Sequence, residues 1–229
     1  LLGTGEMGYP FARWVTQDLI LDEETALVSL KARLLPGKMA IIGPISSNLP
    51  SERASQFLTR ATGLQHGSIL RHSDLERAQD RLLSRDLYSF VGTPEVYLTS
   101  SVDTVGIHFP VTERTKVNRF QVVLGLSRKE GDEPTRISGE VDLKLPNMAG
   151  TGRSLGIGWR DDGNEKSWFG FSYLEPLAFG TPLDTEIILD NEVQTDSYTR
   201  FRLDNRWRVP VVALWGVELG LGWDRSTYP

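Results

Sequence analysis

The sequence predicts an α+β domain of order strand-helix-helix-strand-strand (β-α-α-β-β), followed by antiparallel up-and-down strands of an incomplete transmembrane β-barrel. Three observations lead to this fold class. Amphipathic helix patterns occur only in the first half of the chain. From Lys116 onward, apolar and polar residues alternate in segment after segment. These segments have the roughly 9–11 residues that a membrane-spanning strand needs.

The composition does not by itself indicate a membrane protein. The 229 residues are 39% hydrophobic and 24% charged, with a formal net charge of -5. Without a basic excess, we expect no nucleic-acid partner. No run approaches the roughly 18 apolar residues of a membrane helix, but this excludes only helical membrane proteins, because alternating strands average to neutral hydropathy. The absence of cysteine excludes disulfides and thiolate metal sites.

Two extended segments open the chain. "FARWVTQDLIL" and "ETALVSLKARLL" have the composition of strands, and the Pro-Gly-Lys that follows is typical of a turn. We interpret residues 9–35 as the last two strands of an earlier copy of the unit that follows. Residues 1–37 are therefore predicted to be the C-terminal part of such a domain, and we expect the chain to begin within it.

Residues 38–114 are predicted to form a complete α+β domain. "MAIIGPISS" predicts a strand, and "PSERASQFLTRATGL" has the apolar spacing of a helix, carried by Ala54, Phe57, Leu58 and Ala61. A second helix is predicted to start at Ser73, which would cap it together with Glu76 in a capping box. The strands "PEVYLTS" and "TVGIHFPVTE" complete the unit.

Residues 115–229 are predicted to form about seven strands of a barrel. The predicted ranges are 117–127, 136–145, 151–160, 165–174, 182–191, 197–208 and 211–223. In the last range one face carries Val211, Ala213, Trp215, Val217, Leu219, Leu221 and Trp223. Tryptophans 159, 207 and 223 lie near the ends of their segments, where an interfacial aromatic girdle would lie.

The links between these strands alternate in character. "RKEGDEPT", "DDGNEK" and "DNEVQTDS" are acidic, whereas "PNMAGTG", "EPLAFGTP" and "VPVV" are apolar or rich in glycine and proline. Because every second link of a meander lies on the same side, the two ends of the sheet are expected to face different surroundings. Asp162-Gly163 is in addition a strong hairpin signal.

A soluble β-sandwich binding module joined to an α+β domain is the alternative interpretation. Sandwich strands also alternate, but they typically have about 5–6 residues, and these segments are longer and carry charges on the inward face. A lipid-facing exterior and a wet interior explain both features. Open sheet edges are not tolerated in hydrocarbon, so we expect the chain to be a fragment of a longer protein, cut at both ends.

Several phrases carry a resemblance to a known family. "GYPFARW" with the two strands after it, and the unit ending in "FPVTERTKVNRFQVVLGLSR", resemble polypeptide-transport-associated (POTRA) domains that run into a barrel. "SGEVDLKLPNMAGTGRSLGIGW", "FGFSYLEPLAFGTPLD" and "DSYTRFRLDNRW" are similar to early barrel strands of BamA/TamA-type outer-membrane assembly proteins. The resemblance covers essentially all 229 residues.

The resemblance implies a machine without covalent catalysis, located in the bacterial outer membrane with periplasmic POTRA domains. Its partners would be outer-membrane lipid, unfolded outer-membrane proteins or secreted passengers, and accessory periplasmic proteins or lipoproteins. Such proteins insert other barrel proteins through a seam between their first and last strands. The alternative within the superfamily is a two-partner secretion pore.

Two sheet edges are the implied sites of client pairing by β-augmentation. At the barrel seam, the predicted residues are Asn118, Phe120, Val122, Leu124 and Leu126. On the POTRA edge strand, they are Glu95, Val96, Tyr97, Leu98 and Thr99.

Enzymatic interpretations find little support in the sequence. His66, His72 and His108 are far apart, and no nucleophile elbow, zinc-binding HExxH pair or phosphate loop occurs. Glu175-Pro176 is interpreted as a strand end, because proline blocks the ladder. We therefore predict no enzyme, no cofactor and no metal site. Four arginines on the second helix could form a basic outer strip: Arg71, Arg77, Arg81 and Arg85.

Overall fold

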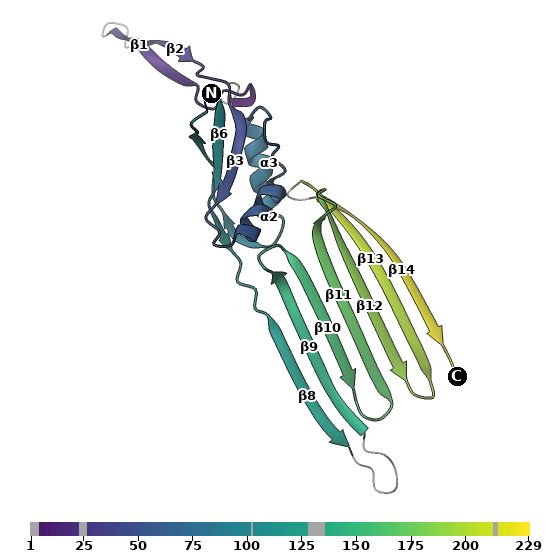
Figure 1. Cartoon of the computed structure of the whole chain (residues 1–229). Helices are drawn as coiled ribbons and strands as arrows, with labels where there is room; N and C mark the ends of the chain where they lie inside the picture. The colour runs from purple at the N-terminus through teal and green to yellow at the C-terminus, as the bar shows by residue number, and fades with distance from the viewer. Residues whose placement is uncertain (1–4, 23–26, 102, 128–135, 213–214) are drawn as a thin grey trace.

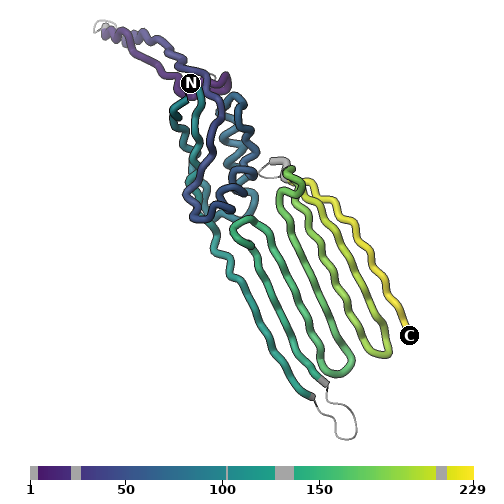
Figure 2. The backbone as a smooth tube through the Cα atoms, viewed as in Figure 1, coloured from purple at the N-terminus to yellow at the C-terminus, as the bar shows by residue number. Residues whose placement is uncertain are grey.

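The computed structural model describes residues 5–22, 27–101, 103–127, 136–212 and 215–229. Three parts follow one another along an elongated molecule (Figure 1). A two-stranded hairpin lies at one end, a small α+β unit follows it, and a seven-stranded sheet extends to the other end. The backbone tube shows that consecutive sheet strands lie side by side as an up-and-down meander (Figure 2).

The N-terminal hairpin confirms the two predicted strands. β1 (Arg13–Asp22) pairs antiparallel with β2 (Leu27–Leu35), with a bulge between Thr16 and Asp18. Most of its large apolar side chains are exposed, including Leu19 and Ile20 on opposite faces of the ribbon. Neither strand is paired with any other described strand.

The α+β unit contains a three-stranded sheet and two helices. In chain order it has β3 (Ile41–Ser47), α2 (Glu52–Thr62), α3 (His72–Leu83), β5 (Glu95–Leu98) and β6 (Thr104–Phe109). The sheet order is β3-β6-β5, with β3 parallel and β5 antiparallel to β6.

Two short strands, not expected from the sequence, are added to this order. β4 (Tyr88–Val91) follows α3, and β7 (Val111–Glu113) follows β6; the two pair as a separate antiparallel ribbon. The segment "TVGIHFPVTE" was expected to be one strand. It is divided at Pro110, which has no N–H to donate to a sheet ladder.

Helix α2 begins and ends where its sequence predicts. The Ser51 side chain accepts a hydrogen bond from the backbone N–H of Ala54, and Gly63 ends the helix in the left-handed conformation, with φ 68°. The predicted apolar stripe is buried: Ala54, Phe57, Leu58 and Ala61.

The capping box predicted for α3 is wrong. The helix begins at His72, and Ser73 lies inside its first turn. The carboxylate of Glu6, distant in sequence, takes the capping role: it accepts hydrogen bonds from the backbone N–H and the hydroxyl of Ser73, both at 2.8 Å. These bonds, led by the one from the hydroxyl, lower the pKa of Glu6. The helix end is thus satisfied by a tertiary contact instead of a local one.

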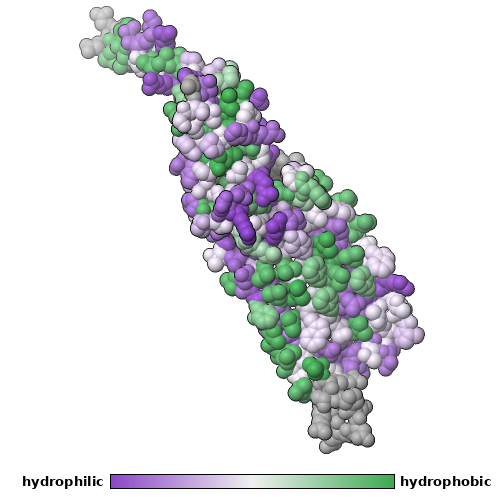
Figure 3. All heavy atoms as spheres, in the orientation of Figure 1, coloured by the Kyte–Doolittle hydropathy of each residue, from purple (hydrophilic) through white to green (hydrophobic). Residues whose placement is uncertain are grey.

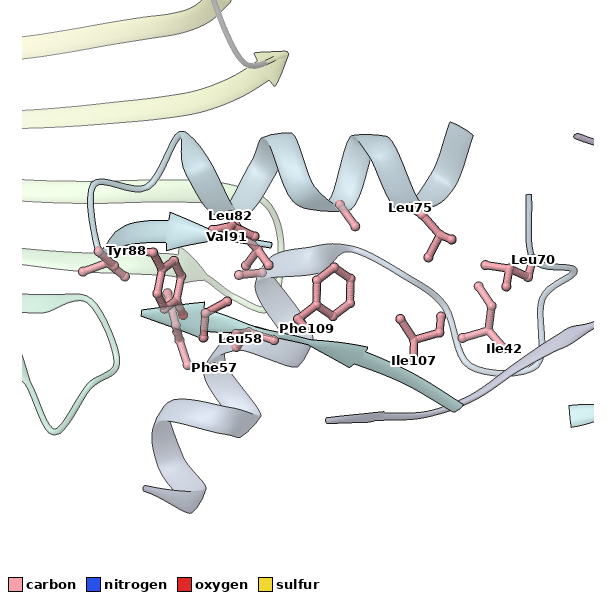
Figure 4. Packing of buried hydrophobic residues seen from close by; sticks show 14 of the residues in the cluster. Ile42, Phe57, Leu58, Leu70, Leu75, Leu82, Tyr88, Val91, Ile107 and Phe109 are labelled. Carbon is pink, nitrogen blue, oxygen red and sulfur yellow. The ribbon is translucent and has the colours of Figure 1, made fainter. Parts of the chain in front are cut away.

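Both helices cover one face of the small sheet and create its core. Phe57 and Leu58 from α2 and Leu82 from α3 belong to one buried cluster with Phe109 of β6. Leu75 of α3 lies in the part of this cluster that contains Leu70 and Ile42 (Figure 4). The same cluster includes Leu177, which comes from the large sheet. The core of the α+β unit therefore extends to the end of β11 in the large sheet.

The seven predicted strands of the second half are confirmed, and all pair antiparallel in the order β14-β13-β12-β11-β10-β9-β8. Their bounds are Arg119–Ser127 (β8), Arg136–Met148 (β9), Arg153–Asp161 (β10), Lys166–Ala178 (β11), Leu183–Gln194 (β12), Tyr198–Val212 (β13) and Trp215–Thr227 (β14). Residues 211–212, predicted to open the last strand, end β13 instead. Ala213 and the link "RKEGDEPT" lie outside the described residues.

Pro176 does not end its strand, contrary to the prediction. β11 continues to Ala178, and the register with β12 shifts between Glu175 and Ala178. A bulge leaves one residue unpaired, so the missing N–H of a proline costs no ladder hydrogen bond there.

The Asp162-Gly163 hairpin is confirmed, with a longer loop than two residues. The Asp162 carboxylate accepts hydrogen bonds from the backbone N–H groups of residues 164, 165 and 166, and these lower its pKa. Gly163 has φ 77°, which the turn requires. In the described part of the chain, no helix is both long and apolar enough to cross a membrane.

Adjacent leucines at the end of α3 allow a test of this core. Leu82 is 0% exposed, whereas Leu83 is 47% exposed. We expect Leu82→Ala to lower the free energy of unfolding of the α+β unit by about 2–5 kcal/mol, because it leaves a cavity. Amide hydrogen exchange of α2 and α3, followed by mass spectrometry, measures the change. Leu83→Ala is the control; equal loss of protection in both variants would contradict the packing.

Candidate functional site at the free sheet edges

The first strand of the large sheet has one unpaired edge. β8 pairs with β9 on one side, from Arg119 opposite Lys144 to Ser127 opposite Arg136. No described strand lies on its other side. Phe120, Leu124 and Leu126 on this strand are exposed, Leu126 by 78%. The predicted seam residues from Phe120 to Leu126 are therefore on a free edge that combines unpaired backbone groups with apolar side chains.

Asn118 is the exception among the predicted seam residues. The strand was expected to start at Val117, but β8 starts at Arg119, and residues 114–118 form an extended connection from the α+β unit. Arg119 begins the ladder, and its side chain pairs with Asp142 of β9 at 3.2 Å. Asn118 lies before the first ladder pair and is exposed.

The last strand provides a second free edge, which the sequence interpretation did not assign to a site. β14 pairs only with β13 among the described strands. Its apolar face is uncovered, and Leu221 is 69% exposed. A meander always leaves its last strand open unless it closes, so this edge could have been deduced from the predicted strand order alone.

One row of apolar residues crosses the whole sheet. Direct pairing joins, strand by strand, Phe120, Leu143, Ile157, Phe171, Leu189, Leu203 and Trp223. No second sheet packs on them within the described ranges. Figure 3 shows apolar residues gathered over the visible face of this sheet.

The apolar stretch shifts along the strands as it crosses the sheet. β8 and β14 run in the same direction. On β8 the stretch begins at the row, with Phe120, and extends forward to Leu126. On β14 it extends back at least to Val217 and ends at the row with Trp223, after which Arg225 follows.

This shift defines an inclined band. The middle of the apolar stretch lies about three residues after the row on β8 and about three residues before it on β14. This shift of about six residues, at about 3.4 Å each, is about 20 Å along the strands. Seven strands about 4.8 Å apart span about 29 Å across the sheet, so the band is inclined by about 35° to the pairing direction. Strands of membrane barrels tilt by about 35–45° from the barrel axis. When strands tilt by this angle, the pairing direction deviates from the membrane plane by the same angle. A band that follows the membrane plane is then inclined to the pairing direction by about 35–45°.

The opposite face of the sheet is charged. Cross-strand ion pairs join Arg160 to Glu140 at 3.0 Å and Arg208 to Glu218 at 2.7 Å, and Arg200 pairs with Asp224. Close beside them, the ring of Trp168 lies over Gly158 and Gly170, where any other residue would clash with it. This face is suited to water, whereas the band is suited to an apolar environment.

The α+β unit has a comparable free edge in β5. Its residues pair with β6, from Glu95 opposite His108 to Leu98 opposite Val105, and no described strand lies beyond them. Glu95, Tyr97 and Leu98 are exposed, and Val96 is half-buried. Thr99 lies outside the strand, and its hydroxyl donates to the carbonyl of Thr104 at the start of β6.

A groove accompanies this edge. It has a volume of about 710 Å³ and is bounded by Val96 of β5, by Leu75 and Gln79 of α3, and by Pro10 and Phe11 of the N-terminal segment. The side chains of a strand added to β5 would alternate between this groove and solvent.

The three histidines do not form a site. His108 shares a hydrogen bond with Ser46 at 3.1 Å, and His72 lies 3.4 Å from Glu76 of its own helix. His66 is in the link between the helices. Across the described ranges, no three histidine or carboxylate side chains are grouped as metal ligands.

The fold defines a class of protein: an α+β unit that leads into an up-and-down sheet, one face of which carries an inclined, uncovered apolar band. No protein-family model matches the sequence, and no curated protein matches it. Among solved structures, the chain is similar to BamA from Haemophilus ducreyi lacking POTRA domains 1–3, with a TM-score of 0.57 and 20% identity, over 97% of this chain and 42% of that one. This likeness establishes a shared fold.

Two further solved structures match over a similar length. CdiB from Acinetobacter baumannii has a TM-score of 0.36 and 10% identity, covering 95% of this chain and 43% of that one. CdiB from Escherichia coli has a TM-score of 0.31 and 11% identity, covering 96% and 43%. The chain thus spans less than half the length of each of these structures.

Tyr97 and Gly106 provide a test of the β5 edge. A methyl group on Gly106 would fall inside the space of the Tyr97 ring on the paired strand. We expect Gly106→Ala to destabilise the β5–β6 pair by about 1–3 kcal/mol through overpacking. Hydrogen exchange of residues 95–98 measures the effect. Adding Tyr97→Ala should restore protection, and failure of this rescue would refute the contact as the cause.

Proposed function

We propose that this chain belongs to an outer-membrane assembly or translocation protein of the BamA/TamA type. In this proposal, residues 38–114 are a POTRA domain in the periplasm, and residues 1–37 are the C-terminal part of another. Residues 115–229 are the first seven strands of a barrel in the bacterial outer membrane. The shared fold with BamA supports this organisation.

The observation that carries the proposal is the inclined apolar band. A soluble sandwich needs a second sheet over its apolar face, and the described residues provide none for β14. Lipid would cover the band, and water would solvate the ion pairs on the other face. The inclination of about 35° is the one that tilted barrel strands require.

The free edges suggest how such a protein would act. Every backbone N–H and C=O needs a partner in hydrocarbon, so β8 and β14 must each be paired with a further strand. An unfolded outer-membrane protein could pair its strands with β8 by β-augmentation. Burial of the client's apolar face in lipid would supply the driving force, without covalent catalysis.

The β5 edge would hold clients before insertion. Its backbone groups are available for an added strand, and the groove beside α3 has room for alternate side chains. Specificity at such an edge is low, because the backbone and not a side-chain pocket makes most of the contacts. This suits a protein that receives many different unfolded chains.

Two neighbouring residues on β13 test the lipid-facing band. Leu203 belongs to the apolar row, and Asp204 points to the charged face. We expect Leu203→Arg to destabilise the barrel in lipid by about 2–4 kcal/mol. Asp204→Arg should have a much smaller effect. Urea unfolding of the whole protein in lipid vesicles, followed by heat-modifiable gel mobility, measures both; equal effects would exclude a membrane band.

Cysteine crosslinking tests the client seam. The chain has no cysteine, so single cysteines at residues 120–126 of β8 are unique reporters. We expect disulfide crosslinks to cysteines in nascent barrel proteins, because β8 has a free edge. A cysteine at Phe171 is the control, since β11 is paired on both sides.

Three results of this experiment differ in meaning. Crosslinks to several barrel proteins support assembly. Crosslinks to one exported protein would indicate a secretion pore of the same superfamily. Crosslinks only to this protein's own strands would contradict client pairing at β8.

A further inference from the structure

The end of α3 is attached to the large sheet by a buried ion pair. Arg85 was expected on an exposed basic strip, but its side chain is only 6% exposed. Its guanidinium lies 3.1 Å from the carboxylate of Asp184 at the start of β12, which is 19% exposed. The same guanidinium lies over the ring of Phe57, 5.8 Å from its centroid. By contrast, Arg77, which lies on α3 itself, is exposed and pairs with nearby Asp74.

Asp184 also forms a hydrogen bond within the large sheet. The oxygen that faces Arg85 accepts a hydrogen bond from the backbone N–H of Leu177 at 3.0 Å. Leu177 has φ 52°, which is unusual for a residue with a side chain, and it is buried in the core of the α+β unit. The Asp184 carboxylate therefore binds both Arg85 of the α+β unit and the bulged end of β11, where Leu177 enters the core of the α+β unit.

A second turn of the sheet makes close contact with the same helices. Gly150 and Gly152, in the β9–β10 turn, have φ 71° and 73°. A methyl group on Gly150 would lie 2.7 Å from the Ala54 side chain, and one on Gly152 would lie 2.9 Å from Leu87. The two sheet turns thus contact the α+β unit at separate points.

We propose that the Arg85–Asp184 pair is a latch that fixes the orientation of the α+β unit on the end of the sheet. Apolar contacts such as that of Leu177 are non-directional and would hold the two parts together at a range of angles. The guanidinium and carboxylate have directional geometry, and burial makes an unpaired partner costly. The latch thereby sets the position of the β5 edge relative to the β8 edge.

This inference concerns the joint itself and stands whether or not the protein inserts clients. Its test is a distance measurement between spin labels at Glu95→Cys and Glu165→Cys in the whole protein in lipid vesicles. Both positions are exposed, on the α+β unit and on the far end of the sheet. With the latch intact, we expect one narrow distance distribution.

Breaking the latch should change this distribution. We expect Arg85→Gln and Asp184→Asn each to lose the single narrow peak, because the asparagine oxygen can still accept from Leu177 but carries no charge to pair with Arg85. Arg77→Gln, at an exposed position of α3, is the matched control and should leave the peak unchanged. A peak that stays narrow in Arg85→Gln would overturn the proposal. A peak that stays narrow in Asp184→Asn would also overturn it, and heat-modifiable mobility confirms that each variant has folded.

Discussion

Backbone hydrogen bonding is the constraint on which the large sheet depends. Each interior strand from β9 to β13 has a hydrogen-bonded neighbour on both sides, so most of its N–H and C=O groups are satisfied within the sheet. β8 and β14 satisfy only half of theirs among the described residues. In water such edges are tolerable, but next to an uncovered apolar face they are reactive toward any other strand. The proposed activity uses this reactivity.

The register of the sheet places its apolar residues in an inclined band. Pairing places one apolar residue of every strand in a single row from Phe120 to Trp223. The apolar stretch then shifts from strand to strand relative to that row. The boundary of the apolar band is therefore inclined to the direction of strand pairing. Alternation alone would not distinguish a sandwich from a barrel. The inclination of the boundary supports the barrel interpretation, because it is close to the tilt of the strands in membrane barrels.

The junction between the α+β unit and the large sheet combines apolar packing with a directional ion pair. Leu177 adds to the core of the α+β unit, and the two glycines of the β9–β10 turn allow its helices to approach closely. The ion pair between Arg85 and Asp184 has directional geometry, which apolar packing lacks, and so fixes the orientation of the α+β unit on the sheet. The edges of β5 and β8 are therefore held in one frame, which a client that passes from one to the other would require.

Local patterns in the sequence determined much of the fold. They identified both helices, the N-terminal hairpin and all seven strands of the large sheet, because alternation with period two and the apolar stripe of a helix depend on nearby residues only. They also located most of the β8 and β5 edge residues. Tertiary structure alone decided the features that join distant residues: Glu6 capping α3 in place of Ser73, the bulge that carries β11 past Pro176, and the β4–β7 ribbon. It also buried Arg85, which by helical spacing belonged to an exposed strip, because its partner Asp184 is 99 residues away in the sequence. Such contacts leave no periodic signal, since their energy arises only after separate elements have packed together.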